Sequence, residues 1–309
     1  NYALFGGGDK DLFNETNTVD AYNASLTRST PTALSVAKRC LGATTVGNYA
    51  LFGGGLPDLF AYSDTVDAYN TSLTHSMATD LSVARGQLAA TTVGNYALFG
   101  GGTVGWTSYS NAVDAYDTSL VHSTRTALSA ARDTLAATTV GNYALFGGGS
   151  ITDGEKTTFY ATVDAYNASL TRSTPTALSA ARDTIGATTV GDYALFGGGG
   201  GSSKMATVDA YNASLTRSIP TALSVARNGI TATTVKGYAL FGGGDASSGT
   251  ATTVDAYNAS LTRSVLTTLS TARLDFAATT VGNYALFGGG TIVNGSNLTG
   301  SNVVEVYTV

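Results

Sequence analysis

The stretch Tyr96-Ala-Leu-Phe-Gly-Gly-Gly102 decides the fold, because it returns along the whole chain. Its glycine run begins at Gly6, Gly53, Gly100, Gly147, Gly197, Gly242 and Gly288. The intervals between these starts are 47, 47, 47, 50, 45 and 46 residues. Seven copies at so regular a period predict a repeat architecture, in which one small structural unit is built many times.

Two further markers recur with the same period. Val-Asp-Ala-Tyr begins at Val19, Val66, Val113, Val163, Val208 and Val254, with a relaxed copy, Val-Glu-Val-Tyr, at Val304. Leu-Ser-x-Ala followed by a cation ends at Lys38, Arg85, Arg132, Arg182, Arg227 and Arg273. We interpret residues 1–309 as one domain, with the first and last repeats incomplete. The repeats start near Asn1, Asn48, Asn95, Asn142, Asp192, Gly237 and Asn283.

Each repeat contains four short segments rich in Val, Thr, Tyr, Phe or Leu. In one repeat they span 90–93, 96–99, 112–116 and 120–124, with Gly, Asn or Ser between them. Such segments predict strands, and no stretch shows the 3.6-residue period of a helix. Four strands in about 47 residues are the unit of a β-propeller blade, so the sequence predicts an all-β fold. We label the strands a to d, from the innermost to the outermost.

The strand count bears on the size of the ring. The chain opens on a b strand at Tyr2 and closes on a c strand at Tyr307, and it holds seven b, seven c, six d and six a strands. We therefore expect a seven-bladed β-propeller of four-stranded antiparallel blades. An upstream piece of about half a repeat would supply the missing d and a strands. A six-bladed ring is the alternative, but it leaves one b and one c strand without a blade.

The repeats resemble kelch repeats. The resemblance is carried by Leu81-Ser-Val-Ala-Arg85, by the following strand that ends in the glycines 100–102, and by Val113-Asp-Ala-Tyr116. It covers nearly the whole chain and implies a kelch-like propeller. Kelch blades usually have a Trp in the outer strand, whereas that region here reads Thr-Arg-Ser, Thr-His-Ser or Val-His-Ser. The resemblance therefore implies an outer strand that packs differently.

The composition excludes several function classes. Lys plus Arg is 16 and Asp plus Glu is 21, for a net charge of −5, which argues against a nucleic-acid partner. No run of 18 apolar residues occurs, so we expect no membrane insertion. The single cysteine excludes an intrachain disulfide framework. The compartment stays open, although an extracellular, cell-surface or virion-surface setting, as part of a larger assembly, is favoured.

The repeats differ mainly at one end of the expected ring. The b–c loops differ in length and composition, and so does the start of strand a, whereas the a–b and c–d turns hardly change. Strand direction places the b–c loops and the d–a segments on the same face. Function usually lies in variable loops on a rigid scaffold, although drift in unconstrained loops is the alternative.

The variable loops are rich in aromatic residues, which commonly anchor recognition surfaces. The candidate ligand-binding residues are Phe13, Phe60, Tyr62, Trp106, Tyr109, Phe159 and Tyr160. We predict a non-enzymatic binding or adhesion module that recognises a protein or glycan ligand through this face. The alternatives are a carbohydrate-active enzyme with an axial active site and a purely structural spacer. Each of the seven aromatics could instead fold back over its own blade.

The sequence offers no catalytic set, metal site or cofactor motif. His75 and His122 occupy the outer-strand position where other repeats have Arg, so we interpret them as surface substitutes for it. Cys40 is interpreted as a small filler. The repeated Asp of strand c and the Arg before strand a recur in every blade, so we assign them to the scaffold. We therefore expect no enzyme activity.

Overall fold

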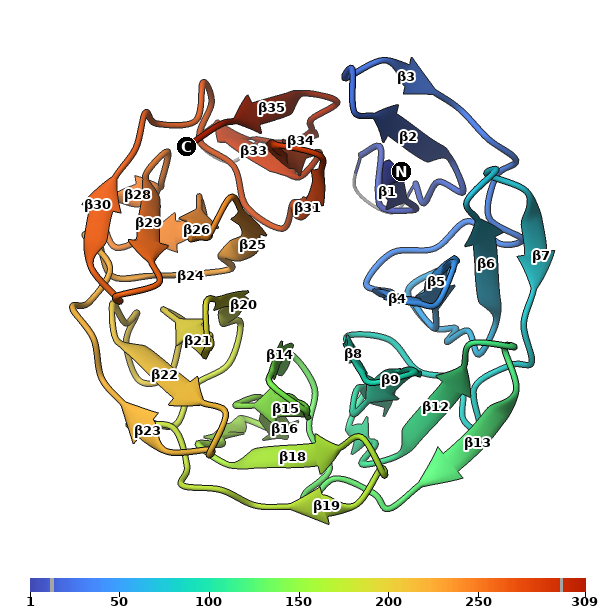
Figure 1. Cartoon of the computed structure of the whole chain (residues 1–309), viewed down its shortest axis with the longest axis horizontal. Coiled ribbons are helices and arrows are strands. Elements are labelled where there is room, and N and C mark those ends of the chain that lie inside the picture. Colours follow the sequence, from blue (N-terminus) through green and yellow to red (C-terminus); the bar gives the residue numbers. More distant parts are fainter. Residues whose placement is uncertain (12–13, 295–296) are drawn as a thin grey trace.

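The computed structural model describes residues 1–11, 14–294 and 297–309, and every regular element in these residues is a β-strand. Sheets built from the repeat strands stand around a common axis, which gives a propeller-like arrangement (Figure 1). The prediction of an all-β fold with repeated four-stranded antiparallel sheets is confirmed. Among the described residues, no helix has the length and apolar character that crossing a membrane requires.

Five of the repeat sheets have four strands, which run in the order a, b, c, d. They are β4 (Gly42–Val46), β5 (Tyr49–Gly53), β6 (Val66–Asn70), β7 (His75–Met77); β8 (Ala89–Val93), β9 (Tyr96–Gly100), β12 (Val113–Asp117), β13 (His122–Arg125); β14 (Ala136–Val140), β15 (Tyr143–Gly147), β18 (Val163–Asn167), β19 (Arg172–Ser173); β20 (Gly186–Val190), β21 (Tyr193–Gly197), β22 (Val208–Asn212), β23 (Arg217–Ser218); and β25 (Thr231–Val235), β26 (Tyr238–Gly242), β29 (Val254–Asn258), β30 (Arg263–Val265). The outer strands begin about two residues later than expected, because Leu120 and its equivalents take left-handed backbone in the c–d turn.

The first and last repeats form three-stranded sheets. The first comprises β1 (Tyr2–Gly6), β2 (Val19–Asn23) and β3 (Arg28–Ser29), and it has no a strand among the described residues. The last comprises β31 (Ala277–Val281), β32 (Tyr284–Gly288) and β35 (Val304–Tyr307), and its described residues include no d strand.

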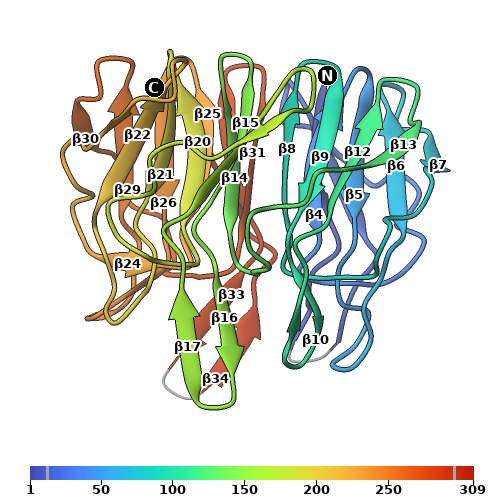
Figure 2. The same cartoon turned by 90° about the horizontal axis from the view of Figure 1, so that it is seen from below.

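Several b–c loops are strand hairpins rather than plain loops. These small sheets are β10 (Thr103–Gly105) with β11 (Ser108–Tyr109), β16 (Ser150–Asp153) with β17 (Lys156–Phe159), β33 (Thr291–Asn294) with β34 (Asn297–Gly300), and β24 (Arg227–Asn228) with β27 (Asp245–Ala246) and β28 (Gly249–Thr250). In β16–β17 the turn passes through Gly154, whose φ of 60° suits a tight hairpin turn. The hairpins β10–β11, β16–β17 and β33–β34 project from the end opposite to both termini (Figure 2).

From the second repeat onward, the b strands are largely buried on both faces, which explains their unbroken apolar sequence. In β9, Ala97, Leu98 and Phe99 are all fully buried. Phe99 packs edge-on against Tyr116 of the neighbouring strand β12, with 5.8 Å between ring centroids. The Tyr116 hydroxyl donates to the Thr79 carbonyl at 2.8 Å and so ties the sheet to the segment that arrives from the preceding repeat.

Adjacent sheets pack closely because of the first glycine in each run. A Cβ added to Gly53 would lie 2.8 Å from Cε1 of Phe99, which belongs to the next sheet. The glycine therefore makes room for the ring of the next repeat. At the axis, the hydroxyls of Thr91 and Thr139 on neighbouring inner strands lie 3.1 Å apart. The Thr-Thr pair of each repeat thus joins the inner strands to one another.

In four of the sheets the repeated Asp and Arg form buried ion pairs, and in a fifth Lys38 takes the place of Arg beside Asp67. Arg85 donates to the Asp114 carboxylate at 2.6 Å, and neither side chain is exposed. The other oxygen of Asp114 lies 2.7 Å from Nε2 of His122. Burial by itself would raise the pKa of Asp114, but Arg85 and hydrogen bonds from His122 and Ser82 outweigh it and hold the pKa below its usual value. The interpretation of the repeated Asp and Arg as scaffold residues is confirmed.

The two histidines have a more specific role than surface substitution. His122 and His75 each bond the buried carboxylate of strand c, as Arg172 does in its own repeat. Both rings are largely buried beside a tyrosine, with centroids 5.1 Å apart. They replace Arg because either side chain can reach the carboxylate from the outer strand.

Candidate functional site

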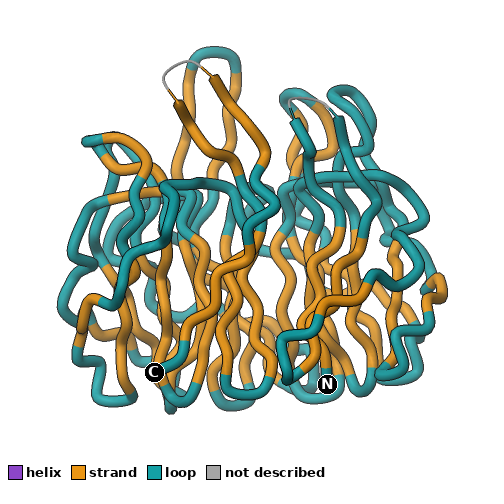
Figure 3. The backbone as a smooth tube through the Cα atoms, turned by 90° about the horizontal axis from the view of Figure 1, so that it is seen from above, coloured by secondary structure: helices purple, strands orange, loops and turns teal. Residues whose placement is uncertain are grey.

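The b–c loops and the d–a segments meet at one end of the propeller, which we call the loop face (Figure 3). From the second repeat onward, short backbone bridges join the two, such as Arg39 with Leu56 and Gly86 with Thr103. The loops therefore stand on a fixed base although their sequences differ. Figure 3 shows the hairpins rising from this face while both chain ends lie at the other.

Two aromatic side chains from different repeats form an exposed pair on the loop face. Phe60 and Trp106 are 72% and 73% exposed, respectively. Their ring centroids lie 5.8 Å apart, and the planes are inclined by 32°. Large apolar side chains left so accessible, and in contact with each other, indicate a surface that can take a ligand.

The loop 56–64 holds Phe60 in place through a local turn. One oxygen of the Asp58 carboxylate accepts hydrogen bonds from the backbone of Phe60 at 2.6 Å and of Ala61 at 2.8 Å. This Asx-type turn fixes the backbone at the aromatic residue. A small cavity of about 180 Å³ lies beside it, lined by Glu15, Asp58, Leu59 and Phe60.

Ion pairs hold the acidic wall of this cavity. Arg39 lies 3.6 Å from the Glu15 carboxylate and 3.3 Å from that of Asp9. Burial raises the pKa of Asp9 above its usual value, although the nearby Arg39 acts to lower it. Glu15 and Asp9 also pair through a backbone bridge, so this wall is continuous with the base of the first b–c loop.

The other candidate aromatics do not join this pair in the described residues. The Tyr109 hydroxyl accepts from the Thr152 amide at 2.7 Å and lies 3.1 Å from the Thr152 carbonyl, so it links two neighbouring hairpins. Tyr62, Phe159 and Tyr160 are partly buried. Phe13 lies outside the described residues. Among the described candidates, Tyr62, Tyr109, Phe159 and Tyr160 are thus less displayed to solvent than Phe60 and Trp106.

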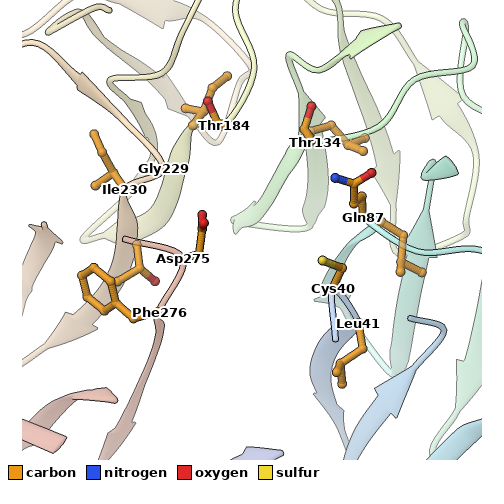
Figure 4. Close-up of a pocket in the computed structure, with 13 residues that line it drawn as sticks. Cys40, Leu41, Gln87, Thr134, Thr184, Gly229, Ile230, Asp275 and Phe276 are labelled. Carbon is orange, nitrogen blue, oxygen red and sulfur yellow. The ribbon is translucent and has the colours of Figure 1, made fainter. Parts of the chain in front are cut away.

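A second feature of the loop face is a cavity of about 440 Å³ on the axis (Figure 4). It is lined by the residues that begin the inner strands, among them Cys40, Gln87, Thr134 and Asp275. The interpretation of Cys40 as a small filler is wrong, because Cys40 is exposed and lines this cavity. The surrounding protein raises the pKa of its thiol to about 11.

An axial active site was among the alternatives that the sequence left open, but the sequence identified no candidate residue for it. The available signal was the variation at the start of strand a, where the repeats are otherwise nearly identical. Among the described residues, no three His, Cys, Asp or Glu side chains come together as a metal site would require.

Comparison with known proteins leaves the chain without an assigned family. No protein-family model matches it, and no curated protein matches it.

Proposed function

We propose that this protein is a non-enzymatic binding module, built as a seven-bladed, kelch-like propeller, which binds a glycan through its loop face. The observation that carries the proposal is the exposed pair of Phe60 and Trp106. A purely structural spacer gains nothing from such a pair, because exposed apolar surface in contact with water costs free energy. The repeat markers that resemble kelch repeats supply the propeller part of the proposal.

A closed ring of seven blades is supported by the contact between the first and last sheets. A Cβ on Gly288 would lie 2.8 Å from Cε1 of Phe5, the same spacing as between Gly53 and Phe99. Ala3, together with Val281 and Leu286 of the last repeat, forms one buried apolar cluster. The first and last sheets therefore pack against each other through the same glycine–phenylalanine contact as other adjacent sheets do. A six-bladed ring would leave these contacts unexplained.

A glycan is favoured over a protein ligand by the shape and chemistry of the surface. The aromatic pair offers flat apolar faces, on which the C–H face of a sugar ring can stack. The adjoining cavity of about 180 Å³ accommodates one six-membered ring, since cavities of roughly 150 Å³ already hold benzene. The second Asp58 oxygen and the Glu15 carboxylate can accept hydrogen bonds from sugar hydroxyls.

A glycan array probed with the full chain tests the proposal. We expect selective binding that is lost in the Phe60→Ser, Trp106→Ser double variant. The matched control is the Val121→Ser, Ile219→Ser variant, which removes two side chains that are 61% and 56% exposed near the outer strands. Full binding by the aromatic double variant would place the site elsewhere. A blank array with the folded parent protein would overturn the glycan assignment in favour of a protein partner.

A further inference from the structure

Six equivalent residues form a collar around the axis at the start of the inner strands. They are Cys40, Gln87, Thr134, Thr184, Gly229 and Asp275, and all have left-handed backbone, with φ between 47° and 60°. All six line the axial cavity. Six successive repeats thus each contribute one residue with left-handed backbone to a common space.

Backbone hydrogen bonds between repeats hold the collar in shape. The Gln87 amide donates to the Cys40 carbonyl at 2.8 Å, and the Thr134 amide donates to the Gln87 carbonyl at 3.1 Å. Two further bonds of 3.0 Å continue this chain through Thr184 to Gly229. Because backbone hydrogen bonds hold the collar residues together, their side chains can differ without disturbing this arrangement.

The side chains at the collar are held at an energetic cost. Left-handed backbone disfavours any residue with a Cβ, and β-branched threonine especially, whereas glycine adopts it freely. Yet only one of the six positions is glycine. Strain retained at equivalent sites points to a role for the side chains.

A comparison within the chain shows that packing does not explain these side chains. The c–d turn also uses left-handed backbone, at Leu26, Leu73, Leu120, Leu170, Leu215 and Leu261. There the residue is identical in every repeat, and leucines such as Leu120 and Leu170 pack on the core between sheets. At the collar the residues differ in size, polarity and charge. We therefore assign these side chains a role in lining the cavity rather than in a packing contact that recurs in every repeat.

The cavity combines an apolar wall with a few free polar groups. Leucine, isoleucine or phenylalanine follows each collar residue, as in Leu41, Ile230 and Phe276. The side chains of Cys40, Gln87 and Asp275 make no hydrogen bond within residues 1–11, 14–294 and 297–309, and all three reach into the cavity (Figure 4). Such a combination is typical of small-molecule sites.

The charge of the lining selects the ligand. Asp275 is the single charged residue of the described lining, and no Lys or Arg contributes to it. The cations adjacent to collar residues in the chain are already engaged, since Arg39 pairs with Asp9 and Glu15, and Arg273 pairs with Glu305 at 2.8 Å. Asp275 makes no ion pair among the described residues, so its carboxylate lacks a counter-ion.

We propose that the axial cavity binds a small organic cation, an ammonium group on a compact apolar body, with Asp275 as its counter-ion. The apolar wall covers the rest of the ligand, and Gln87 lies across the cavity from Asp275 (Figure 4). This inference does not rest on the glycan proposal, because it concerns different residues and a different class of ligand.

Isothermal titration of the full chain with 2-phenylethylammonium and with the neutral isostere 2-phenylethanol tests the inference. We expect one saturable amine site and at least about tenfold weaker binding of the alcohol, because a charge-assisted contact is worth about that factor. Asp275→Asn should weaken amine binding by about the same factor. The matched control is Asp192→Asn, which changes an exposed aspartate in an a–b turn at the opposite face. Circular dichroism and the melting temperature establish that both variants are folded.

Equal affinities for amine and alcohol would overturn the inference, as would unchanged amine binding by Asp275→Asn or no amine binding at about 10 mM. Alkylation of Cys40, the only cysteine of the chain, supplies an independent measurement. A bulky group on its sulfur would fill the cavity and should abolish amine binding. Amine binding that survives complete alkylation would place the ligand elsewhere.

Discussion

In three repeats, two arginines of very different burial bind the same carboxylate. Asp164 accepts from Arg132 at 2.8 Å on one oxygen and from Arg172 at 2.7 Å on the other. Arg132 is fully buried and also donates to the carbonyls of Gly148 and Phe146. Arg172 retains 26% side-chain exposure. The inner cation therefore organises the d–a segment, whereas the outer cation closes the sheet edge.

Arg132→Met should destabilise the protein far more than Arg172→Met. The first change leaves a buried carboxylate and two buried carbonyls without their donor, at a cost of about 3–5 kcal/mol. The second removes a partly solvated partner, at a cost of about 1 kcal/mol or less. Urea unfolding gives both values. Similar losses for the two variants would show that burial does not separate their roles.

Asp133 should make the stability of the protein sensitive to pH. Burial, with a smaller effect of Asp183, raises the pKa of its carboxyl from 3.8 to about 6. The folded state thus favours the protonated carboxyl. The resulting gain in folding stability is complete below the pKa that the group has in the unfolded chain, and it is lost as the pH rises through about 6. Asp133→Asn, a neutral isostere, should match the parent near pH 4 and exceed its stability by about 2 kcal/mol near pH 8.

Urea unfolding of the parent and Asp133→Asn across this pH range measures the difference. Because both proteins share every other titrating group, only position 133 contributes to it. A stability difference that does not change with pH would contradict the prediction. The same substitution at the exposed position Asp192 provides the control variant.

At the scale of the element, the glycine that ends each b strand controls the packing between sheets. A Cβ on Gly147 would lie 2.9 Å from Phe196 of the next sheet, so Gly147→Ala should cost about 1–3 kcal/mol through overpacking. Gly105→Ala is the control, because its nearest neighbour is an exposed serine side chain at 3.4 Å. Thermal unfolding compares the two. A neutral Gly147→Ala would mean that adjacent sheets can move apart freely.

The hairpin β16–β17 should be separable from the fold. Its base is formed by the backbone pair of Asp133 with Ser150, which matches the pair of Asp183 with Gly200 in the next repeat. Replacing residues 151–159 by residues 201–204 keeps this base. We expect a melting temperature within about 3 °C of the parent, since loop closure changes by only a few tenths of a kcal/mol.

A longer replacement that also removes Ser150 serves as the comparison. It deletes the hydrogen bond of 2.8 Å from the Ser150 hydroxyl to Asp183, at a cost of about 1 kcal/mol. If the shorter replacement already prevents folding, the hairpin is a structural plug and not a separable loop. Glycan binding should change with either replacement only if the ligand extends from Phe60 and Trp106 as far as this hairpin.

At the scale of the whole molecule, the junction of the first and last sheets determines whether the ring is closed. Gly288→Ala would drive a Cβ into Phe5, just as Gly197→Ala would into Phe241. In a closed ring both variants should lose about 1–3 kcal/mol. A neutral Gly288→Ala beside a destabilised Gly197→Ala would show that the ring is open at this junction. Thermal unfolding of the two variants makes the comparison.

The sequence by itself determined the repeat, the strands and the tight turns. These features depend on neighbours in the chain: glycine permits the a–b turn at Gly94, and Asn70 caps the c–d turn through its own side chain, 2.9 Å from the Ser72 amide. Residues close together in the sequence determine the conformation of such turns. The alternation of these signals was therefore enough to predict an all-β repeat protein.

Only the tertiary structure decided which loop residues are displayed. Phe60 and Trp106 meet from different repeats, 46 positions apart, whereas Tyr109 is bound by the neighbouring hairpin. The axial collar likewise exists only where the repeats converge, so that Cys40 and Asp275, far apart in the chain, line the same cavity from different sides. Exposure and convergence are set by how whole sheets pack. The sequence of one repeat contains no information on which residues of the others it will face.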